Sequence, residues 1–333
     1  MKQAMQAILE VLGDSGNVLI ASHAQPDGDA LGAMAAMAFM LKQFGKRVEH
    51  YNVSGIPKDF RLLELSGPWR RSLAELGDFS PDVYVVLDCG DAARAGPELA
   101  PLILRKRSVN IDHHLGNPLF GTAANWVDPK MVASAQMVGY LAREAGFELG
   151  GLLGEAVYLG LNADTGSFRF DSTTPEAFEL AADIVRNGLR LGKFFTKYEK
   201  QWSQNRLRLW GNLMQNIQVH CGGRVVLSLI NADMLAAYGA GRDDLENFAS
   251  FLQCLRGVDV TLLLRENGPG RSKASLRSVD AVNVQAMAAE FNGGGHRNAA
   301  GADLNLDPEA AAPVLLDAVS RHLALAAEKG YGK

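Results

Sequence analysis

The chain has little cysteine and no long apolar run. Three cysteines occur among 333 residues, Cys89, Cys221 and Cys254, and none of them forms a C-x-x-C pair. This low density excludes a disulfide-stabilised scaffold, so we expect a cytoplasmic protein in which each cysteine is a small buried residue. No apolar run reaches the ~20 residues that span a bilayer. Polar residues interrupt the apolar positions near the N-terminus, which predicts an amphipathic helix rather than a signal peptide.

The chain also lacks an excess of positive charge. It carries 33 Lys and Arg residues against 37 Asp and Glu residues, for a net charge of -4 and a pI near 6.0. This balance excludes a broad electrostatic grip on long nucleic acid, so any contact with nucleic acid should be short and local. The composition, 47% hydrophobic and 21% charged, is typical of a globular protein, and the length allows two domains with separate cores.

Short apolar runs alternate with helical patterns in the first half of the chain. Strands are predicted at 18–21, 47–52, 83–87 and 108–111, and helices at 30–44, 132–145 and 154–162. This alternation predicts the α/β class with a mainly parallel, doubly wound sheet. The later part of the sequence predicts a helical stretch at 175–218, strands at 224–230, 258–264 and 273–277, and helices at 243–255 and 283–291. We therefore expect a first domain at 1–190, a helical linker at 191–221 and a smaller α/β domain at 222–333.

Acidic residues and histidines follow four of these segments in the first domain. They are His23, Asp27 and Asp29; Asp88; Asp112, His113 and His114; and Asp164. Because each group follows an apolar stretch where a strand or helix should end, all four could meet at one edge of the sheet. Four aspartates in one place repel one another, and two divalent cations would balance their charge. The sequence therefore predicts a dinuclear metal site.

The first of these groups has an alternative interpretation. Pro26 and Gly28 favour a tight loop in which Asp27 and Asp29 could point at different ions, whereas a helix would separate them by about 200°. The alternative is that the two aspartates cap the following helix. The same order of apolar strand and polar residue recurs before Asp88 and before Asp112, and this repetition favours the metal site.

These motifs resemble the DHH phosphoesterase superfamily. The resemblance rests on His23-x-x-x-Asp27-x-Asp29, Asp88, Asp112-His113-His114 and Asp164-Thr165-Gly166. The C-terminal part resembles the DHHA1 domain through Ser275-Leu276-Arg277-Ser278 and the run from Gly293 to Gly301. Together these motifs cover nearly the whole chain, which is most similar to the nanoRNase and pAp phosphatase branch.

The resemblance implies a ligand set. One ion would be held by His23, Asp27 and Asp88, and the other by Asp29, Asp88, His113 and Asp164, with Asp88 bridging the two. Oxygen-rich ligands with one imidazole for each ion suit Mn²⁺, with Mg²⁺ or Co²⁺ as alternatives. The pair of ions would share a hydroxide that attacks phosphorus.

The resemblance also implies roles for the two other residues of the central motif. His114 would face the substrate phosphate, and Asp112 would orient a neighbouring histidine. The alternative for His114 is a buried histidine with a structural role. Cys89 is rejected as a nucleophile because an activated water would already be present beside it.

The second domain is expected to bind the far end of the substrate. Gly293, Gly294 and Gly295, taken as a loop, leave backbone N–H groups open to an anion, with His296 and Arg297 beside them. Arg277 could bind a phosphate through its planar fork. In the first domain, Arg94 is a further candidate for a phosphate contact, with simple solvent exposure as the alternative. The alternative for the glycine run, taken alone, is a flexible turn.

Gln136 of the first domain stands where many relatives carry an acidic residue. The hydrogen bonds of its side chain should therefore be neutral here.

The sequence therefore predicts a dinuclear-metal phosphoesterase. Its expected substrates are oligoribonucleotides of about two to five nucleotides, because the chain offers little to hold more distant phosphates. It would also convert 3′-phosphoadenosine 5′-phosphate (pAp) to AMP. The alternatives are hydrolysis of linear or cyclic dinucleotides such as pGpG and, from another class, a nucleotide-binding regulator without activity. We expect no long nucleic acid and no membrane as partners, and a homodimer is left open.

Overall fold

The chain divides into two compact units. The structure, a computed structural model, describes residues 1–57, 60, 69–198, 202–279 and 282–328. The first unit is Met1–Gln201 and the second is Trp202–Lys333. The stretch 191–221, expected as a helical linker, is shared between them: helix α7 (Leu191–Tyr198) lies in the first unit, and helix α8 (Gln204–Gln215) and strand β7 (Gln218–His220) lie in the second.

The first unit is built on a parallel sheet, as the sequence predicts. Its six strands have the order β3-β2-β1-β4-β5-β6, and every neighbouring pair is parallel. The strands are β1 (Asn17–Ala21), β2 (Arg47–Tyr51), β3 (Trp69–Arg70), β4 (Val83–Leu87), β5 (Ser108–Asp112) and β6 (Ala124–Val127). The edge strands β3 and β6 are not predicted from the sequence: β3 has only two residues, and in β6 Asn125 interrupts the apolar run of Ala124, Trp126 and Val127.

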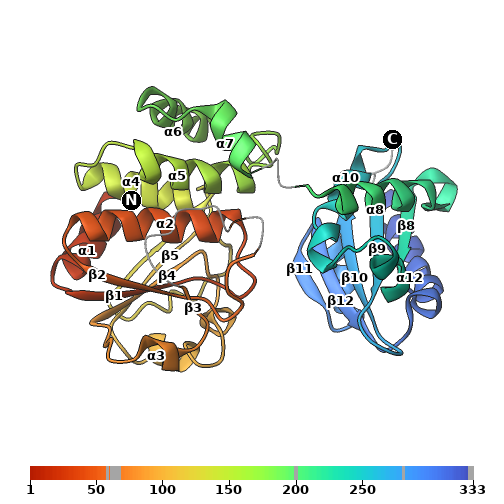
Figure 1. The fold of residues 1–333 in the computed structure, drawn as a ribbon, viewed down its shortest axis with the longest axis horizontal. Helices are drawn as coiled ribbons and strands as arrows, with labels where there is room; N and C mark the ends of the chain where they lie inside the picture. The colour runs from red at the N-terminus through yellow and green to blue at the C-terminus, as the bar shows by residue number, and fades with distance from the viewer. Residues whose placement is uncertain (58–59, 61–68, 199–201, 280–281, 329–333) are drawn as a thin grey trace. The chain divides into compact units, whose positions relative to one another are not determined.

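Helices cover both faces of this sheet (Figure 1). On one face lie α1 (Lys2–Gly13), α2 (Gly28–Gln43), α4 (Ser134–Glu144) and α5 (Gly151–Asp164), and the short α3 (Ala100–Ile103) lies on the other. Helix α6 (Pro175–Arg186) packs on α5 as an outer layer.

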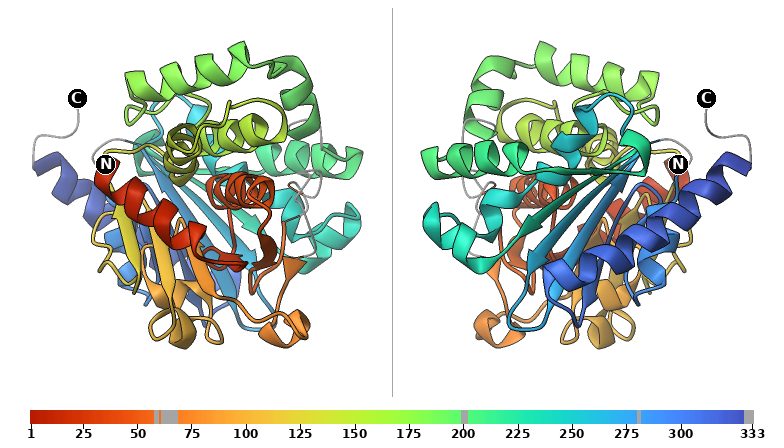
Figure 2. Two further views of the ribbon diagram at one scale, coloured as in Figure 1. Left: turned by 90° about the vertical axis from the view of Figure 1, so that its left-hand side faces the viewer. Right: turned by 90° about the vertical axis from the view of Figure 1, so that its right-hand side faces the viewer.

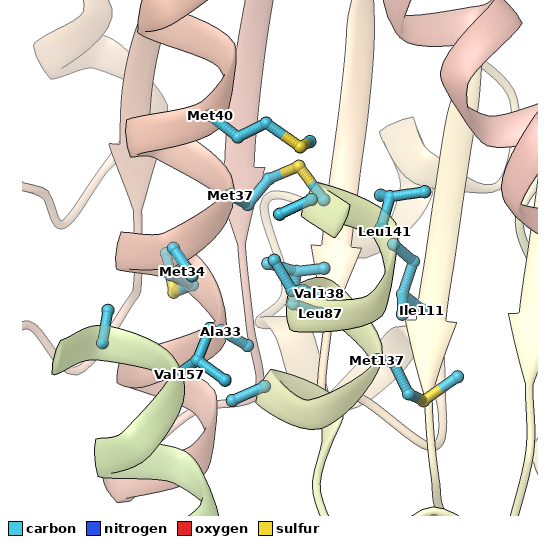
Figure 3. Packing of buried hydrophobic residues seen from close by; sticks show 14 of the residues in the cluster. Ala33, Met34, Met37, Met40, Leu87, Ile111, Met137, Val138, Leu141 and Val157 are labelled. Carbon is cyan, nitrogen blue, oxygen red and sulfur yellow. The ribbon is translucent and has the colours of Figure 1, made fainter. Parts of the chain in front are cut away.

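The core beneath α2 is rich in methionine. In Figure 3, Met34, Met37 and Met40 of α2 lie near Val138 and Leu141 of α4, with strand residues Leu87 and Ile111 close by; all are buried. Burial of each such side chain contributes roughly 1.5–3 kcal/mol.

Two glycines let α2 and α5 approach closely. A Cβ at Gly32 would lie 2.5 Å from the carbonyl oxygen of Ala156, and a Cβ at Gly160 would lie 2.5 Å from Asp29 Oδ1. The close contact places the beginning of α2 beside the last turn of α5. Among the described residues, no helix is both long and apolar enough to cross a membrane.

The second unit has its own sheet of mixed direction. Its order is β11-β12-β10-β9-β8-β7, with β8 and β9 parallel and the other pairs antiparallel. The remaining strands are β8 (Val225–Ile230), β9 (Val260–Glu266), β10 (Ser272–Ser278), β11 (Gly294–His296) and β12 (Ala299–Leu304). Helices α8 and α10 (Phe248–Phe251) cover one face, and α11 (Val284–Ala289) and α12 (Pro308–Glu328) cover the other. Figure 2 shows α12, in dark blue, running across the strands. A further helix, α9, spans Ala232–Ala237.

Two expectations for this unit are wrong. The helix expected at 243–255 is broken into three short turns, Arg242–Leu245, α10 and Leu252–Cys254, because Asn247 has a φ of +63° and interrupts the helical path. The glycine run expected as a loop forms strand β11 from Gly294 onward, because it pairs with β12 in a tight hairpin.

Candidate metal centre

The predicted polar residues meet at one edge of the first sheet. Strands β1, β4 and β5 are adjacent and parallel, so their carboxyl ends lie side by side. The side chains form three overlapping groups, and within each group the ligand atoms lie within 4.8 Å of one another: His23, Asp27 and Asp88; Asp29, His113 and Asp164; and Asp88, His113 and His114. The structure thus gathers segments that are far apart along the chain.

His23, Asp27 and Asp88 make up the first group. His23 Nε2 lies 3.4 Å from Asp88 Oδ2 and 3.9 Å from Asp27 Oδ2. The other ring nitrogen, Nδ1, lies 2.9 Å from the carbonyl oxygen of Ala24. A hydrogen bond from Nδ1 to this carbonyl directs the lone pair of Nε2 toward the carboxylates, the arrangement that imidazole ligands of metals require.

The geometry of Asp27 is compatible with both roles that the sequence allows. Its Oδ1 accepts hydrogen bonds from the backbone N–H groups of Asp29 and Ala30, at 3.0 and 3.1 Å, and so caps α2. Its Oδ2 faces His23. Helix capping and metal binding are therefore compatible, because each uses a different oxygen.

Asp29 lies in the first turn of α2, which begins at Gly28 and not at Ala30 as expected. Its carboxylate is fully buried and accepts two backbone hydrogen bonds from the start of α4: Ser134 N–H to Oδ2 at 2.6 Å and Ala135 N–H to Oδ1 at 2.9 Å. His113 Nε2 is 3.8 Å from Oδ2. Asp29 therefore caps a helix that begins more than 100 residues later, a contact that the sequence does not reveal.

His113 and Asp164 complete the second group. His113 Nε2 lies 3.2 Å from Asp164 Oδ2 and 3.5 Å from Asp88 Oδ1, and its Nδ1 lies 3.2 Å from the carbonyl oxygen of Met131. Asp164 is the last residue of α5, whereas the sequence placed it just beyond the helix. Both histidines of the two groups thus have one nitrogen beside a backbone carbonyl and the other facing carboxylates.

Asp88 lies between the two groups. Its Oδ2 faces His23, and its Oδ1 faces His113 and also accepts a hydrogen bond from Ser134 Oγ at 3.1 Å. The backbone of Asp88 has a φ of +52°, which is rare for a residue other than glycine and costs roughly 1–3 kcal/mol. Ser134 was not a predicted site residue, because a serine at the start of a helix has no distinctive sequence signal.

His114 and Asp112 form a separate pair beside Asp88. His114 Nδ1 lies 2.7 Å from Asp112 Oδ1, and Asn117 Nδ2 donates to Asp112 Oδ2 at 2.7 Å. Burial raises the pKa of Asp112, but the hydrogen bonds from His114 and Asn117 outweigh it and bring the pKa below its ordinary value. Asp112 therefore remains an ionised acceptor that fixes the ring of His114. Asn117 was not a predicted site residue, and its hydrogen bond fixes the carboxylate of Asp112.

Protein groups alone do not balance the charge of this cluster. Burial and the charges of Asp88 and Asp164 raise the pKa of Asp29 well above its ordinary value, and burial with neighbouring carboxylates raises that of Asp164. Burial lowers the pKa of His113, but hydrogen bonds to Asp164 and Asp88 raise it to about 12. Burial likewise lowers the pKa of His23, but the hydrogen bond to Asp88 and the charges of Asp88 and Asp27 raise it above its ordinary value. Divalent cations would supply the missing positive charge.

The donor set fits hard or intermediate cations. It consists of carboxylate oxygens and imidazole nitrogens, which suit Mn²⁺, Mg²⁺ and Co²⁺ better than a thiolate site would. The nearby Cys89 is buried, as expected, and its Sγ donates to the carbonyl oxygen of Asp91 at 3.0 Å, whereas the same expectation is wrong for Cys221 and Cys254, which are exposed. Burial raises the pKa of this thiol to about 12, so it stays protonated at neutral pH and is a poor nucleophile.

Metal binding should strengthen as pH rises. The pKa values of Asp29, Asp164, His23 and His113 are all raised, so these groups retain protons that a cation must displace. Affinity should increase by about tenfold per pH unit for each proton released. Titration calorimetry with Mn²⁺ between about pH 6 and about pH 8, in buffers of different ionisation enthalpy, measures the affinity and the number of protons released on binding. A pH-independent affinity without proton release would contradict this account.

Two predicted substrate residues of the second unit, Arg277 and His296, lie on strands that flank β12 and pair with the same residue of it. Arg277 of β10 pairs with Ala299 of β12, which pairs with His296 of β11. Arg277 is half-buried: its Nε donates to Ser250 Oγ at 3.2 Å and its Nη1 to the carbonyl oxygen of Leu276 at 2.9 Å. These bonds fix the guanidinium and leave hydrogens at its Nη1 and Nη2 end that could reach a phosphate.

The glycine run allows strand β11 to pack closely. A Cβ at Gly293 would lie 2.3 Å from the carbonyl oxygen of Gly301, and one at Gly295 would lie 2.4 Å from that of Ala299. Gly294 has open space, and β11 is an edge strand, so its outer backbone groups are not used by the sheet. Arg297 follows in the turn and is exposed.

The two remaining predicted positions lie in the first unit. Arg94 is exposed, and its carbonyl oxygen accepts from Ala24 N at 2.6 Å, which places its backbone beside the loop that follows β1. Gln136 is buried in α4; its Oε1 accepts from Val132 N at 2.9 Å and its Nε2 donates to Tyr140 Oη at 3.1 Å. The hydrogen bonds of Gln136 are neutral, as expected.

Comparison with known proteins identifies the family of this chain. The chain matches the models of the DHH family, N-terminal domain, over residues 17–161 and of the DHHA1 domain over residues 224–324. It is 32% identical over 324 residues to the bifunctional oligoribonuclease and PAP phosphatase NrnA of Thermus thermophilus, covering 96% of this chain and 95% of that protein. The protein of the same name from Bacillus subtilis is 24% identical, with 86% and 89% covered.

A solved structure has the same fold. The exopolyphosphatase-related protein from Bacteroides fragilis superimposes with a TM-score of 0.91 at 25% sequence identity, covering 98% of each chain. The two matched domains account for both units described above, and the Thermus relative covers nearly the full length. The chain therefore belongs to the DHH family, with a DHHA1 domain as its second unit.

Proposed function

We propose that this chain is a metal-dependent phosphoesterase that hydrolyses oligoribonucleotides of about two to five nucleotides to mononucleotides. It would also convert pAp to AMP. The observation that carries the proposal is the position of Asp88, whose two oxygens face two different groups of ligand atoms. The similarity to the oligoribonuclease and PAP phosphatase of Thermus and Bacillus supports the substrate class.

We assign two cations to the cluster. His23, Asp27 and Asp88 would hold one, and Asp29, Asp88, His113 and Asp164 the other, in line with the groups of ligand atoms. Mn²⁺ is the proposed ion, because mixed carboxylate and imidazole ligands suit it well. Bound cations of this kind supply a water of lowered pKa and offset charge on the phosphoryl oxygens.

His114 and Asp112 would act on the substrate side of the reaction. Asp112 accepts the Nδ1–H of His114, which fixes the orientation of the ring. His114 Nε2 would face the substrate, to donate a hydrogen bond to a phosphoryl oxygen or to act as the general acid toward the leaving oxygen. Asn117 would maintain this geometry through Asp112.

The proposal is tested with a length series. The Mn²⁺-loaded protein is incubated with 5′-labelled oligoribonucleotides from two to about twenty nucleotides, with pAp and with pGpG, and products are followed over time. We expect turnover to fall steeply beyond about five nucleotides and to stop on chelation, because the acidic chain has few groups to hold more phosphates. Equal turnover of the long substrates, or activity that survives chelation, would contradict the proposal.

Arg277→Ala tests the role of the second unit. Loss of a charge-assisted hydrogen bond to phosphate should raise KM for a trinucleotide by about 10- to 100-fold. Metal content should not change, because Arg277 belongs to the second unit and the ligand cluster to the first. Arg265→Ala, which removes a partly buried arginine from the neighbouring strand β9, is the matched control and should leave KM within about twofold. An unchanged KM in Arg277→Ala would remove this residue from the proposed contacts.

A further inference from the structure

The first turn of α4 is attached to the ligand cluster by three hydrogen bonds. The backbone N–H groups of Ser134 and Ala135 donate to Asp29, and the hydroxyl of Ser134 donates to Asp88 Oδ1 at 3.1 Å. Ser134 thereby connects a carboxylate of the second ligand group to the carboxylate shared by both groups. Ser134, Asp29 and Asp88 are all buried.

Helix capping does not explain this serine. Residue Ala133 occupies the N-cap position of α4 and makes no side-chain cap, while Asp29 supplies the acceptor for the free N–H groups of the first turn. The Ser134 hydroxyl is therefore directed away from its own helix and toward Asp88. A buried hydroxyl in contact with a carboxylate acts as a donor that does not titrate.

Asp88 needs such a constraint. Its backbone has a φ of +52°, and its two oxygens must face opposite groups if the carboxylate is to serve both. A hydrogen bond to Oδ1 from a fixed donor selects one rotation of the carboxylate. The donor is itself fixed, because Asp29 accepts the backbone N–H of the same residue at 2.6 Å.

We propose that Ser134 is a positioning residue that holds the Asp88 carboxylate between the two ligand groups, an inference that rests on the proposed function. Residues that orient metal ligands typically change metal affinity by about 10- to 100-fold when they are removed. Ser134 does not contact the substrate in this assignment, so its effect should appear in metal binding before substrate is added.

The test compares Ser134→Ala with Ser108→Ala. Ser108 is also fully buried, on β5, and its hydroxyl donates to the carbonyl oxygen of Ile103 at 2.6 Å, away from the ligand cluster. Ser134→Ala loses the hydrogen bond to Asp88, and Ser108→Ala loses the bond to Ile103 together with the one that Ser108 Oγ accepts from Thr122 N at 3.0 Å. Both variants should therefore lower the melting temperature of the protein without added metal, and Ser108→Ala at least as much. Only Ser134→Ala should weaken Mn²⁺ binding, by about 10- to 100-fold in equilibrium dialysis.

A second readout reports on geometry. With two equivalents of Mn²⁺, the wild-type protein should give the electron paramagnetic resonance spectrum of two exchange-coupled ions, and Ser134→Ala should give that of isolated ions. Ser134→Thr keeps the hydroxyl and should bind Mn²⁺ within about threefold of the wild type.

Two outcomes would overturn the inference. One is wild-type Mn²⁺ affinity in Ser134→Ala, and the other is an equal loss of affinity in Ser108→Ala. If the wild-type protein itself binds no Mn²⁺, the proposed function fails instead, so the two failures are distinguishable.

Discussion

Asp88→Asn is expected to lower kcat for a dinucleotide with Mn²⁺ by roughly 10³-fold or more, equivalent to about 4 kcal/mol of lost transition-state stabilisation. Asp88 is the one residue in the described part of the chain whose two carboxylate oxygens face separate ligand groups. An amide offers one neutral oxygen in place of two charged ones, so one ion would lose this ligand and the other would keep only a neutral and weaker one. Steady-state kinetics and the metal content after dialysis measure the effect.

Asp91→Asn is the matched control for this substitution. Asp91 is exposed, lies three residues further along the chain and caps a short turn through Ala93 N at 2.7 Å. Asparagine caps almost equally well, so activity should stay within about twofold. Near-normal turnover of Asp88→Asn would refute the assignment of Asp88 as the shared ligand.

His114→Ala should reduce kcat by about 10²- to 10⁴-fold, the usual contribution of a general acid or base. The two ions should remain bound, since His114 Nδ1 is engaged by Asp112 at 2.7 Å and is not needed as a ligand. Asp112→Asn should give a smaller loss of kcat, because the amide oxygen can still accept the Nδ1–H that orients the ring, through a weaker, neutral hydrogen bond.

His322→Gln is the control for a histidine remote from the cluster. His322 lies in the second unit, paired with Glu290 at 2.7 Å, and its loss should leave kcat unchanged. A His114→Ala variant that loses metal together with activity would show that this histidine is a ligand and not a substrate contact.

The parallel sheet and the ligand cluster could be predicted because both depend on short sequence patterns, an apolar run followed directly by a polar residue. Val83–Leu87 is a five-residue apolar run, long enough to predict a buried strand, and Asp88 follows it directly. Carboxyl ends of adjacent parallel strands meet at one edge, so the convergence of Asp88 with the loops after β1 and β5 needs no long-range information.

Contacts between distant segments could not be predicted in this way. The bond between Asp29 and Ser134 joins residues 105 positions apart, and the two residues have no joint signal in a single sequence. Asn117 similarly reaches Asp112 by a turn whose path is decided by packing. The sequence also does not show that Oδ1 of Asp27 caps the helix while Oδ2 faces His23, so it cannot reveal that capping and metal binding are compatible.

Short or irregular elements were the other source of error. Strand β11 contains two glycines and a histidine, a composition with low strand propensity, and it forms because β12 pairs with it. The segment 243–255 has helical periodicity, yet Asn247 in a left-handed conformation divides it. At β11 the pairing with β12 overrides local preference, whereas Asn247 belongs to a residue type that enters the left-handed region more readily than most.

Crystals grown with Mn²⁺ and measured at the manganese absorption edge would test the central claim most directly. We predict two anomalous peaks, one against His23, Asp27 and Asp88 and the other against Asp29, Asp88, His113 and Asp164. A single peak, or peaks that do not contact Asp88, would contradict the account.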